Sequence, residues 1–238
     1  MKTTMIKLSG ESLKGTESPF NFVKFLTLAE VIHEAAESGK HRMFLTIGGG
    51  NIIRGRSFTG CSNADDAVDY AGMLASTQNA LLLRKALLEH GSRSIVITPD
   101  NFTIPECFHS EDIRADDRIV LLGGGLGIPG NSTDSSTVKN AAAYGCDEII
   151  FLKMGTDGLY DRNPNDEDEE VRKAAVFIPR IRYKDYCRLG LCAVDPEAIT
   201  PLCGTDIVTY IAGSDPEILR LLLRGEPDRL TRCSILTD

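Results

Sequence analysis

Short apolar runs alternate with longer stretches of helical spacing from one end of the chain to the other. The apolar runs predict strands over residues 5–8, 43–47, 94–98, 118–122, 148–153, 207–211 and 233–236. The stretches between them predict helices over residues 22–37, 66–90, 133–144, 195–202 and 216–224. This rhythm is typical of α/β proteins, and it predicts a three-layer sandwich with a mainly parallel central sheet and helices on both faces.

The predicted elements follow one another without a repeat, a linker or a low-complexity tract. We therefore expect residues 1–238 to form a single domain whose two halves are lobes of one continuous sheet. The segment 163–170 is rich in acidic residues and is expected to be a solvated loop. Hydrophobic residues make up 42% of the chain and charged residues 25%, which fits an ordinary globular protein.

The overall charge narrows the classes of function. A formal net charge of −8 argues against a general nucleic-acid-binding protein and against a polybasic protein of membrane surfaces. No apolar run approaches the roughly 18 residues of a membrane-spanning helix, and residues 1–7 lack the apolar segment of a secretory signal. The seven cysteines are scattered without a CxxC pair, so we expect reduced thiols, no metal site and a cytoplasmic location.

Glycine-rich or polar turns follow three of the predicted strands, at residues 9–11, 48–51 and 123–131. Parallel sheets bind ligands at the carboxyl ends of their strands, and bare glycine backbone can approach phosphate oxygens closely. Lys7 and Arg54 add full positive charges beside these turns. Neither a Walker motif nor the dinucleotide fingerprint after the first strand is present, so we expect a phosphate-handling enzyme of another class.

Taken together, these motifs resemble those of the bacterial uridylate kinases of the amino-acid kinase family, from Lys7 to the C-terminus. The matching residues are 7–11, 47–51 with 54–55, 69–75 with Asn79, 133–135, 153–160 with Pro164, and 194–195. The resemblance implies the amino-acid kinase fold and transfer of the γ-phosphate of ATP to UMP, in pyrimidine nucleotide biosynthesis. It also implies Mg²⁺ bound with ATP and a homohexamer, with the N-terminal lobe holding mainly the acceptor and the C-terminal lobe mainly ATP.

The resemblance also assigns roles to individual residues. Those expected to be catalytic are Lys7, Asp134 and Arg54. Those expected to bind ATP are Lys7, Leu8, Ser9, Gly10, Gly50, Arg54, Tyr160 and Asn163. Those expected to bind UMP are Gly49, Asp69, Leu126, Gly127, Ile128, Pro129, Gly130, Asn131, Ser132 and Thr133. Two rival interpretations remain open: Asp134 could cap a helix, and Asp69 could be a polar-face residue.

The third glycine-rich turn, residues 123–131, is the acceptor loop, and it departs most from the family pattern. Leu126 stands where the family has threonine, and Ile128 stands where it has asparagine. The stretch 153–157 is one residue shorter than in the family pattern, and Asn163 stands where the family has an aspartate that would contact ATP. Because missing polar groups change the choice between related ligands, two alternatives stay open: a kinase of this family with another small acceptor, or a non-catalytic nucleotide-binding sensor or storage protein.

Overall fold

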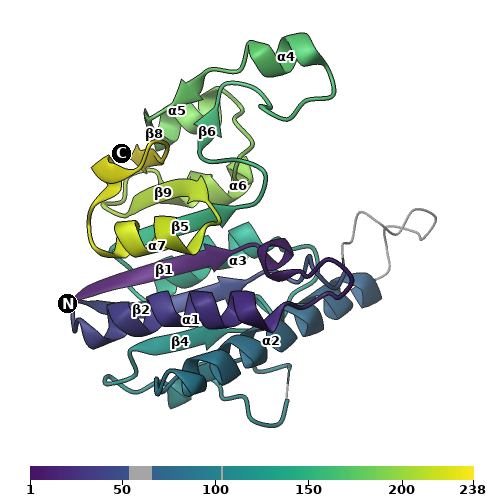
Figure 1. Cartoon of the computed structure of the whole chain (residues 1–238), viewed down its shortest axis with the longest axis vertical. Helices are drawn as coiled ribbons and strands as arrows, with labels where there is room; N and C mark the ends of the chain where they lie inside the picture. Colours follow the sequence, from purple (N-terminus) through teal and green to yellow (C-terminus); the bar gives the residue numbers. More distant parts are fainter. Residues whose placement is uncertain (54–65, 103) are drawn as a thin grey trace.

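The computed structural model describes residues 1–53, 66–102 and 104–238, and its centre is an eight-stranded sheet (Figure 1). Its strands are β1 (Lys2–Leu8), β2 (His41–Ile47), β3 (Ile95–Ile97), β4 (Ile119–Leu122), β5 (Glu148–Lys153), β8 (Arg180–Arg182), β9 (Val208–Gly213) and β10 (Ser234–Thr237). They lie in the order β3-β4-β2-β1-β5-β9-β10-β8. Neighbouring strands run parallel, apart from the antiparallel pair β9 and β10.

Helices cover both faces of this sheet. The helices on one face are α1 (Phe22–Glu37), α2 (Asp66–Glu89) and α7 (Pro216–Leu223). Those on the other face are α3 (Thr133–Ala143), α5 (Tyr183–Arg188) and α6 (Pro196–Ile199). Alternate residues of a strand pack in the cores on opposite faces of the sheet. Ile6 of β1 packs with the first group of helices and Met5 with the second. The predicted three-layer α/β sandwich is confirmed.

The first long helix shows how local sequence fixes an element. The Asn21 side chain accepts a hydrogen bond from the Val23 N–H at 3.1 Å and caps α1. The helix ends before Gly39, whose φ of +69° suits glycine. The observed bounds, Phe22–Glu37, are those predicted from the apolar spacing.

The greatest difference from the prediction lies between β5 and β9. This stretch adds β6 (Leu159–Tyr160), α4 (Glu169–Lys173), β7 (Phe177–Ile178), β8 and α5, and β6 and β7 form a separate antiparallel pair. The acidic segment 163–170 is therefore a loop only in part, because Asp168 caps α4. The predicted helix over 195–202 divides into α6 and a 3-10 turn, Thr200–Leu202, since Pro201 lacks the N–H that would continue the helix.

Three further 3-10 turns complete the described part of the chain. They are Gly10–Leu13, Ser110–Asp112 and Pro227–Arg229. In the described ranges, no helix is long and apolar enough to cross a membrane.

A buried polar chain ties the amino-terminal edge of the sheet together. The hydroxyl of Thr4 on β1 donates to Glu148 of β5 at 2.8 Å and lies 3.1 Å from Nδ1 of His41 on β2. The other ring nitrogen of His41 lies 2.7 Å from the carbonyl oxygen of Leu223, at the end of α7. All three side chains are buried, and the Thr4 hydroxyl is the hydrogen-bond partner that Glu148 and His41 share.

We expect the substitution Thr4→Val to lower the free energy of unfolding by about 1–3 kcal/mol, because it leaves a buried carboxylate and a buried imidazole without their shared partner. Urea titration measures this change. Thr27→Val is the matched control: Thr27 is exposed on α1, so that variant should stay within about 0.5 kcal/mol of the original chain. Equal losses in the two variants would contradict the role of the buried chain.

Candidate active site

Strand alternation brings two lysines to one face of the sheet. On β1, Met5 packs in the core on the α3 side, so Lys7, two residues later, points the same way. On the neighbouring strand β5, Phe151 packs on that side, and Lys153 follows it at the same spacing. Both lysines therefore reach the carboxyl edge of the sheet facing the beginning of α3.

Asp134, in the first turn of α3, contacts both lysines. Its Oδ1 lies 3.1 Å from Nζ of Lys7, and its Oδ2 accepts a 2.6 Å hydrogen bond from Nζ of Lys153. Lys7 is only 8% exposed and Asp134 only 7%. We call these three side chains the lysine–aspartate cluster.

The residue that caps the N-terminus of α3 is Ser132, and Asp134 does not cap it. The Ser132 side chain accepts a hydrogen bond from the Ser135 N–H at 3.1 Å, and Ser132 is the N-cap of α3. The rival interpretation of Asp134 as the helix cap is therefore wrong. The carboxylate of Asp134 is left for the lysines.

The cluster carries one positive charge more than its single carboxylate balances. Burial would raise the pKa of Asp134, but the charges and hydrogen bonds of Lys7 and Lys153 outweigh burial and hold that pKa below 3.8. Burial and the charge of Lys7 together lower the pKa of Lys153, against the opposing effect of Asp134 and Asp195. A negatively charged ligand at this point would therefore stabilise both ammonium groups.

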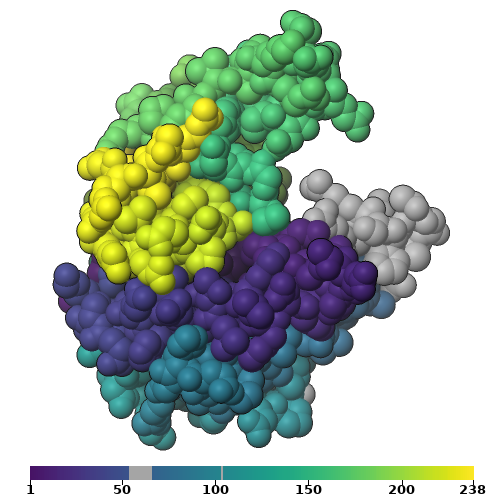
Figure 2. All heavy atoms as spheres, viewed as in Figure 1, coloured from purple at the N-terminus to yellow at the C-terminus, as the bar shows by residue number. Residues whose placement is uncertain are grey.

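A cleft of about 590 Å³ opens beside the cluster, where the glycine-rich turns meet. We call it the first cleft. Among the predicted site residues, those that line it are Lys7, Ser9, Gly10, Gly49, Gly50, Asp69, Leu126, Ile128, Asn131, Ser132 and Thr133. In the space-filling view, the molecule is hollowed on the side where the green segments of the second half of the chain and the purple N-terminal segments face each other (Figure 2).

Two glycines, Gly10 and Gly49, allow the backbone of the turns to lie close to neighbouring segments. A Cβ atom on Gly10 would lie 2.1 Å from the carbonyl oxygen of Gly48, and one on Gly49 would lie 2.7 Å from the Cβ of Ala75. Both distances are far below van der Waals contact, so a side chain at either position would push the backbone segments apart. The glycines therefore set the width of the first cleft.

The acceptor loop, residues 123–131, is held by side chains from two other segments. Oδ2 of Asp69 on α2 accepts a hydrogen bond from the Gly130 N–H at 2.6 Å. From the segment after β3, the Asn101 amide donates to the carbonyl oxygen of Gly127 at 2.8 Å. Asp69 is thus more than a polar-face residue of α2, because it spans the cleft to the loop.

A second cleft, of about 550 Å³, begins at Lys153 on the other side of the cluster. Tyr160 and Asn163 line it, as do residues 190–193. The hydroxyl of Tyr160 donates to Oδ1 of Asp157 at 2.6 Å. Arg232, which precedes β10, donates to the same hydroxyl, and its guanidinium lies 5.6 Å from the centre of the Tyr160 ring. These contacts fix the aromatic wall of the second cleft.

Some predicted site residues lie elsewhere. Leu8 is buried beneath the turns and lines neither cleft. Gly127, Pro129 and Gly130 shape the backbone of the acceptor loop and are absent from the lining of the first cleft. Arg54 lies outside the described residues, so its predicted role stays a prediction.

Lys153 is the site residue that sequence reasoning missed. It belongs to the matching motifs, but no role was assigned to it. The signal was available: Lys153 lies two residues after the buried Phe151 near the end of its strand, just as Lys7 lies two residues after the buried Met5. The pairing of β1 with β5 then brings the two lysines together.

In the part of the chain that the structure describes, no group of three or more His, Cys, Asp and Glu side chains could hold a metal ion. Asp134 is already bonded to two ammonium groups. A divalent cation at the cluster would therefore need anionic ligands that arrive with it.

Comparisons with known proteins agree with this geometry. The model of the amino acid kinase family matches residues 2–213. A uridylate kinase of Streptococcus thermophilus is 30% identical over 231 residues, which cover 94% of this chain and 92% of that protein.

Two solved structures are similar over the whole chain. The UMP kinase from Ureaplasma parvum has a TM-score of 0.86 and 25% identity, covering 100% of this chain and 99% of the other. The UMP kinase from Bacillus anthracis has a TM-score of 0.81 and 25% identity, covering 100% and 96%. The chain therefore belongs to the amino acid kinase family, and its predicted resemblance to the uridylate kinases of that family is confirmed.

Proposed function

We propose that the chain is a nucleoside monophosphate kinase that phosphorylates UMP to UDP with ATP. The observation that carries this proposal is the lysine–aspartate cluster, whose surplus positive charge lies between two clefts at the carboxyl edge of the sheet. The uridylate kinases and UMP kinases to which the chain is similar support UMP as the acceptor.

In the proposed reaction, a phosphate oxygen of UMP attacks the γ-phosphorus of ATP in line. The new P–O bond forms as the bond from the γ-phosphorus to the bridging oxygen breaks, and ADP leaves with the electron pair. A phosphate monoester is already anionic at neutral pH, so no general base is needed. The chain contributes positioning and charge: Lys7 and Lys153 neutralise the transferring group, and Asp134 holds both ammonium groups in place.

The two substrates occupy the two clefts in this proposal. UMP lies in the first cleft, with its phosphate toward Gly49 and its nucleoside along Asp69 and residues 126–133. The base and ribose of ATP lie in the second cleft beside Tyr160 and Asn163. The γ-phosphate reaches Lys7, Ser9, Gly10 and Gly50, and Arg54 adds charge there. Residues 1–238 act as one domain, with the acceptor in the N-terminal lobe and ATP mainly in the C-terminal lobe.

Mg²⁺ belongs to the proposal as the partner of ATP. Its ligands would be mainly phosphate oxygens and water, because Asp134 is already neutralised by two lysines. When bound, the ion supplies charge neutralisation of the phosphates.

We further propose a homohexamer in the cytoplasm that serves pyrimidine nucleotide biosynthesis. Self-association is supported by the large apolar side chains that α2 leaves exposed at helical spacing, namely Tyr70, Leu74 and Leu88. The described cysteines are free thiols, in keeping with a reducing compartment.

The first test measures turnover of UMP, CMP, AMP, carbamate and acetylglutamate with ATP and Mg²⁺. We expect UDP formation. In Lys7→Met we expect kcat to fall at least about 100-fold, because the positive charge that stabilises the transferring phosphate is lost. Lys40→Met, at an exposed lysine far from both clefts, should keep full activity. Turnover of another acceptor alone, nucleotide binding without product, or an active Lys7→Met variant would each contradict the proposal.

The second test concerns the charge of Asp134. Its pKa in the folded chain lies below 3.8, so its contribution to stability is complete above pH 3.8 and is lost as the pH falls through the folded pKa. Asp134→Asn leaves two buried ammonium groups uncompensated, and we expect it to cost about 3 kcal/mol of unfolding free energy at pH 7. Urea titrations should show this difference shrinking below pH 3.8. A difference that does not change with pH would argue against the ion pairs.

The third test concerns the wall of the second cleft. Arg232→Met removes the hydrogen bond to Tyr160 and the ring contact, and we expect it to raise the KM for ATP about three- to tenfold with a smaller change in kcat. Arg229→Met is the control, because Arg229 in the same segment pairs with Glu226 at 2.6 Å, away from Tyr160. An unchanged KM for ATP in Arg232→Met would show that the position of Tyr160 does not affect ATP binding.

A further inference from the structure

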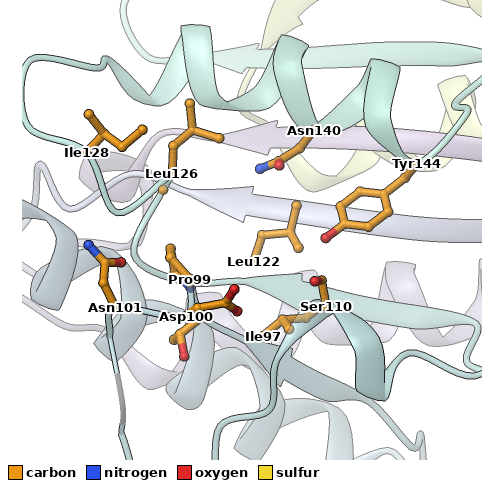
Figure 3. A pocket seen from close by; sticks show the side chains of 13 residues that line it. Ile97, Pro99, Asp100, Asn101, Ser110, Leu122, Leu126, Ile128, Asn140 and Tyr144 are labelled. Carbon is orange, nitrogen blue, oxygen red and sulfur yellow. The ribbon is translucent and has the colours of Figure 1, made fainter.

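A third cavity lies behind the acceptor loop. It has a volume of about 430 Å³ and lies at the carboxyl ends of β3 and β4, between α3 and the segment 98–101. In Figure 3, Asn140 on α3 and Tyr144, directly after the end of α3, lie across the cavity from Asp100 and Ser110. We call this cavity the rear pocket. The carboxyl ends of parallel strands are where α/β proteins bind ligands, and this volume is within the range of small-molecule sites.

Three polar side chains of the rear pocket are without a described hydrogen-bond partner, whereas Asn101 bonds to Gly127 and Asp100 lies 3.5 Å from Nδ1 of His109. The Asn140 amide, the Tyr144 hydroxyl and the Ser110 hydroxyl make no hydrogen bond to any other side chain or backbone group that the structure describes. Tyr144 is nevertheless held in place, because its ring stacks on Phe44 with centroids 4.5 Å apart and an interplanar angle of 9°. Burial raises the pKa of Tyr144, so its hydroxyl keeps its proton and can donate a hydrogen bond.

The charge of the rear pocket differs from that of the first cleft. Among its described lining residues there is no lysine or arginine, and Asp100 carries the one charge. The first cleft also has carboxylates in its lining, Glu11 and Asp69, but it contains the cation Lys7. A phosphate group in the rear pocket would meet a carboxylate and no cation, so the chemistry favours an uncharged ligand.

We propose that the rear pocket binds an uncharged nucleoside or nucleobase. The amide of Asn140 offers a donor and an acceptor side by side, which complements the paired donor and acceptor on the edge of a heterocyclic base. Leu122, Pro99 and Leu126 supply apolar surface for the faces of the ring. The hydroxyls of Tyr144 and Ser110 are free to bond further polar groups of the ligand.

This pocket shares a wall with the first cleft. Gly125, Leu126 and Ile128 line both cavities, so the acceptor loop lies between them. Asn101 holds the carbonyl oxygen of Gly127 from the rear side, while Asp69 holds the Gly130 N–H from the front. A ligand behind the loop therefore changes the affinity for the acceptor in front, and by linkage the acceptor changes the affinity for that ligand. This coupling rests on the proposed function, whereas the binding itself does not.

Binding is tested by isothermal titration of the full chain, first saturated with UMP, with uridine, cytidine, adenosine and guanosine. We expect one of these nucleosides to bind at one equivalent per chain. Tyr144→Phe and Asn140→Ala should each weaken it about tenfold, as loss of a buried hydrogen bond does. Gln78→Ala removes a side-chain amide from an exposed position on α2 and should bind as the original chain does.

Several results would overturn the proposal: none of the four nucleosides binds to the UMP-saturated chain, a nucleoside binds only when UMP is absent, or Tyr144→Phe and Asn140→Ala bind with unchanged affinity. The bound nucleoside should also change the dissociation constant of UMP about fivefold or more, and an unchanged constant would contradict the coupling. Nucleoside binding requires no turnover, so a chain that binds a nucleoside but forms no UDP would refute the proposed kinase function alone.

Discussion

The enclosed charge of Lys7, Asp134 and Lys153 is the constraint on which the site depends. Two ammonium groups and one carboxylate are kept from water, and the single carboxylate pairs with both ammonium groups. Such an arrangement requires two adjacent parallel strands that end together and a helix that begins opposite them, which β1, β5 and α3 provide. A transferring phosphoryl group would neutralise the surplus positive charge. Burial therefore makes the cluster costly without its ligand and selective for an anion.

The same edge of the sheet carries three cavities, and two of them lie beside that charge. The first cleft depends on glycines whose replacement would force backbone segments apart, so its shape is set by packing rather than by side-chain contacts alone. The second cleft depends on side chains from distant parts of the sequence, since Arg232 fixes Tyr160 across 72 positions. The rear pocket shares the acceptor loop with the first cleft, and two side-chain hydrogen bonds hold that loop from opposite sides. A rigid sheet thus carries one loop that both cavities can influence.

Much of this could be predicted from the sequence, because strong local signals carry it. The helix over residues 22–37 and the strand over 148–153 have the predicted bounds, and the glycine-rich turns meet at one cleft as expected. Features that arise from pairing between distant segments escaped prediction. The short β6–β7 pair has no periodic signal, the burial of Leu8 depends on what covers β1, and the role of Lys153 appears only when β5 lies beside β1. The rear pocket likewise combines segments that no sequence pattern connects.

The most direct measurement of the central claim is a crystal structure of the chain with UMP, Mg²⁺ and a non-hydrolysable ATP analogue. The account predicts the γ-phosphate within hydrogen-bond distance of Nζ of both Lys7 and Lys153, with the phosphate of UMP facing it from the first cleft. A γ-phosphate held elsewhere, with both lysines still bonded only to Asp134, would contradict it.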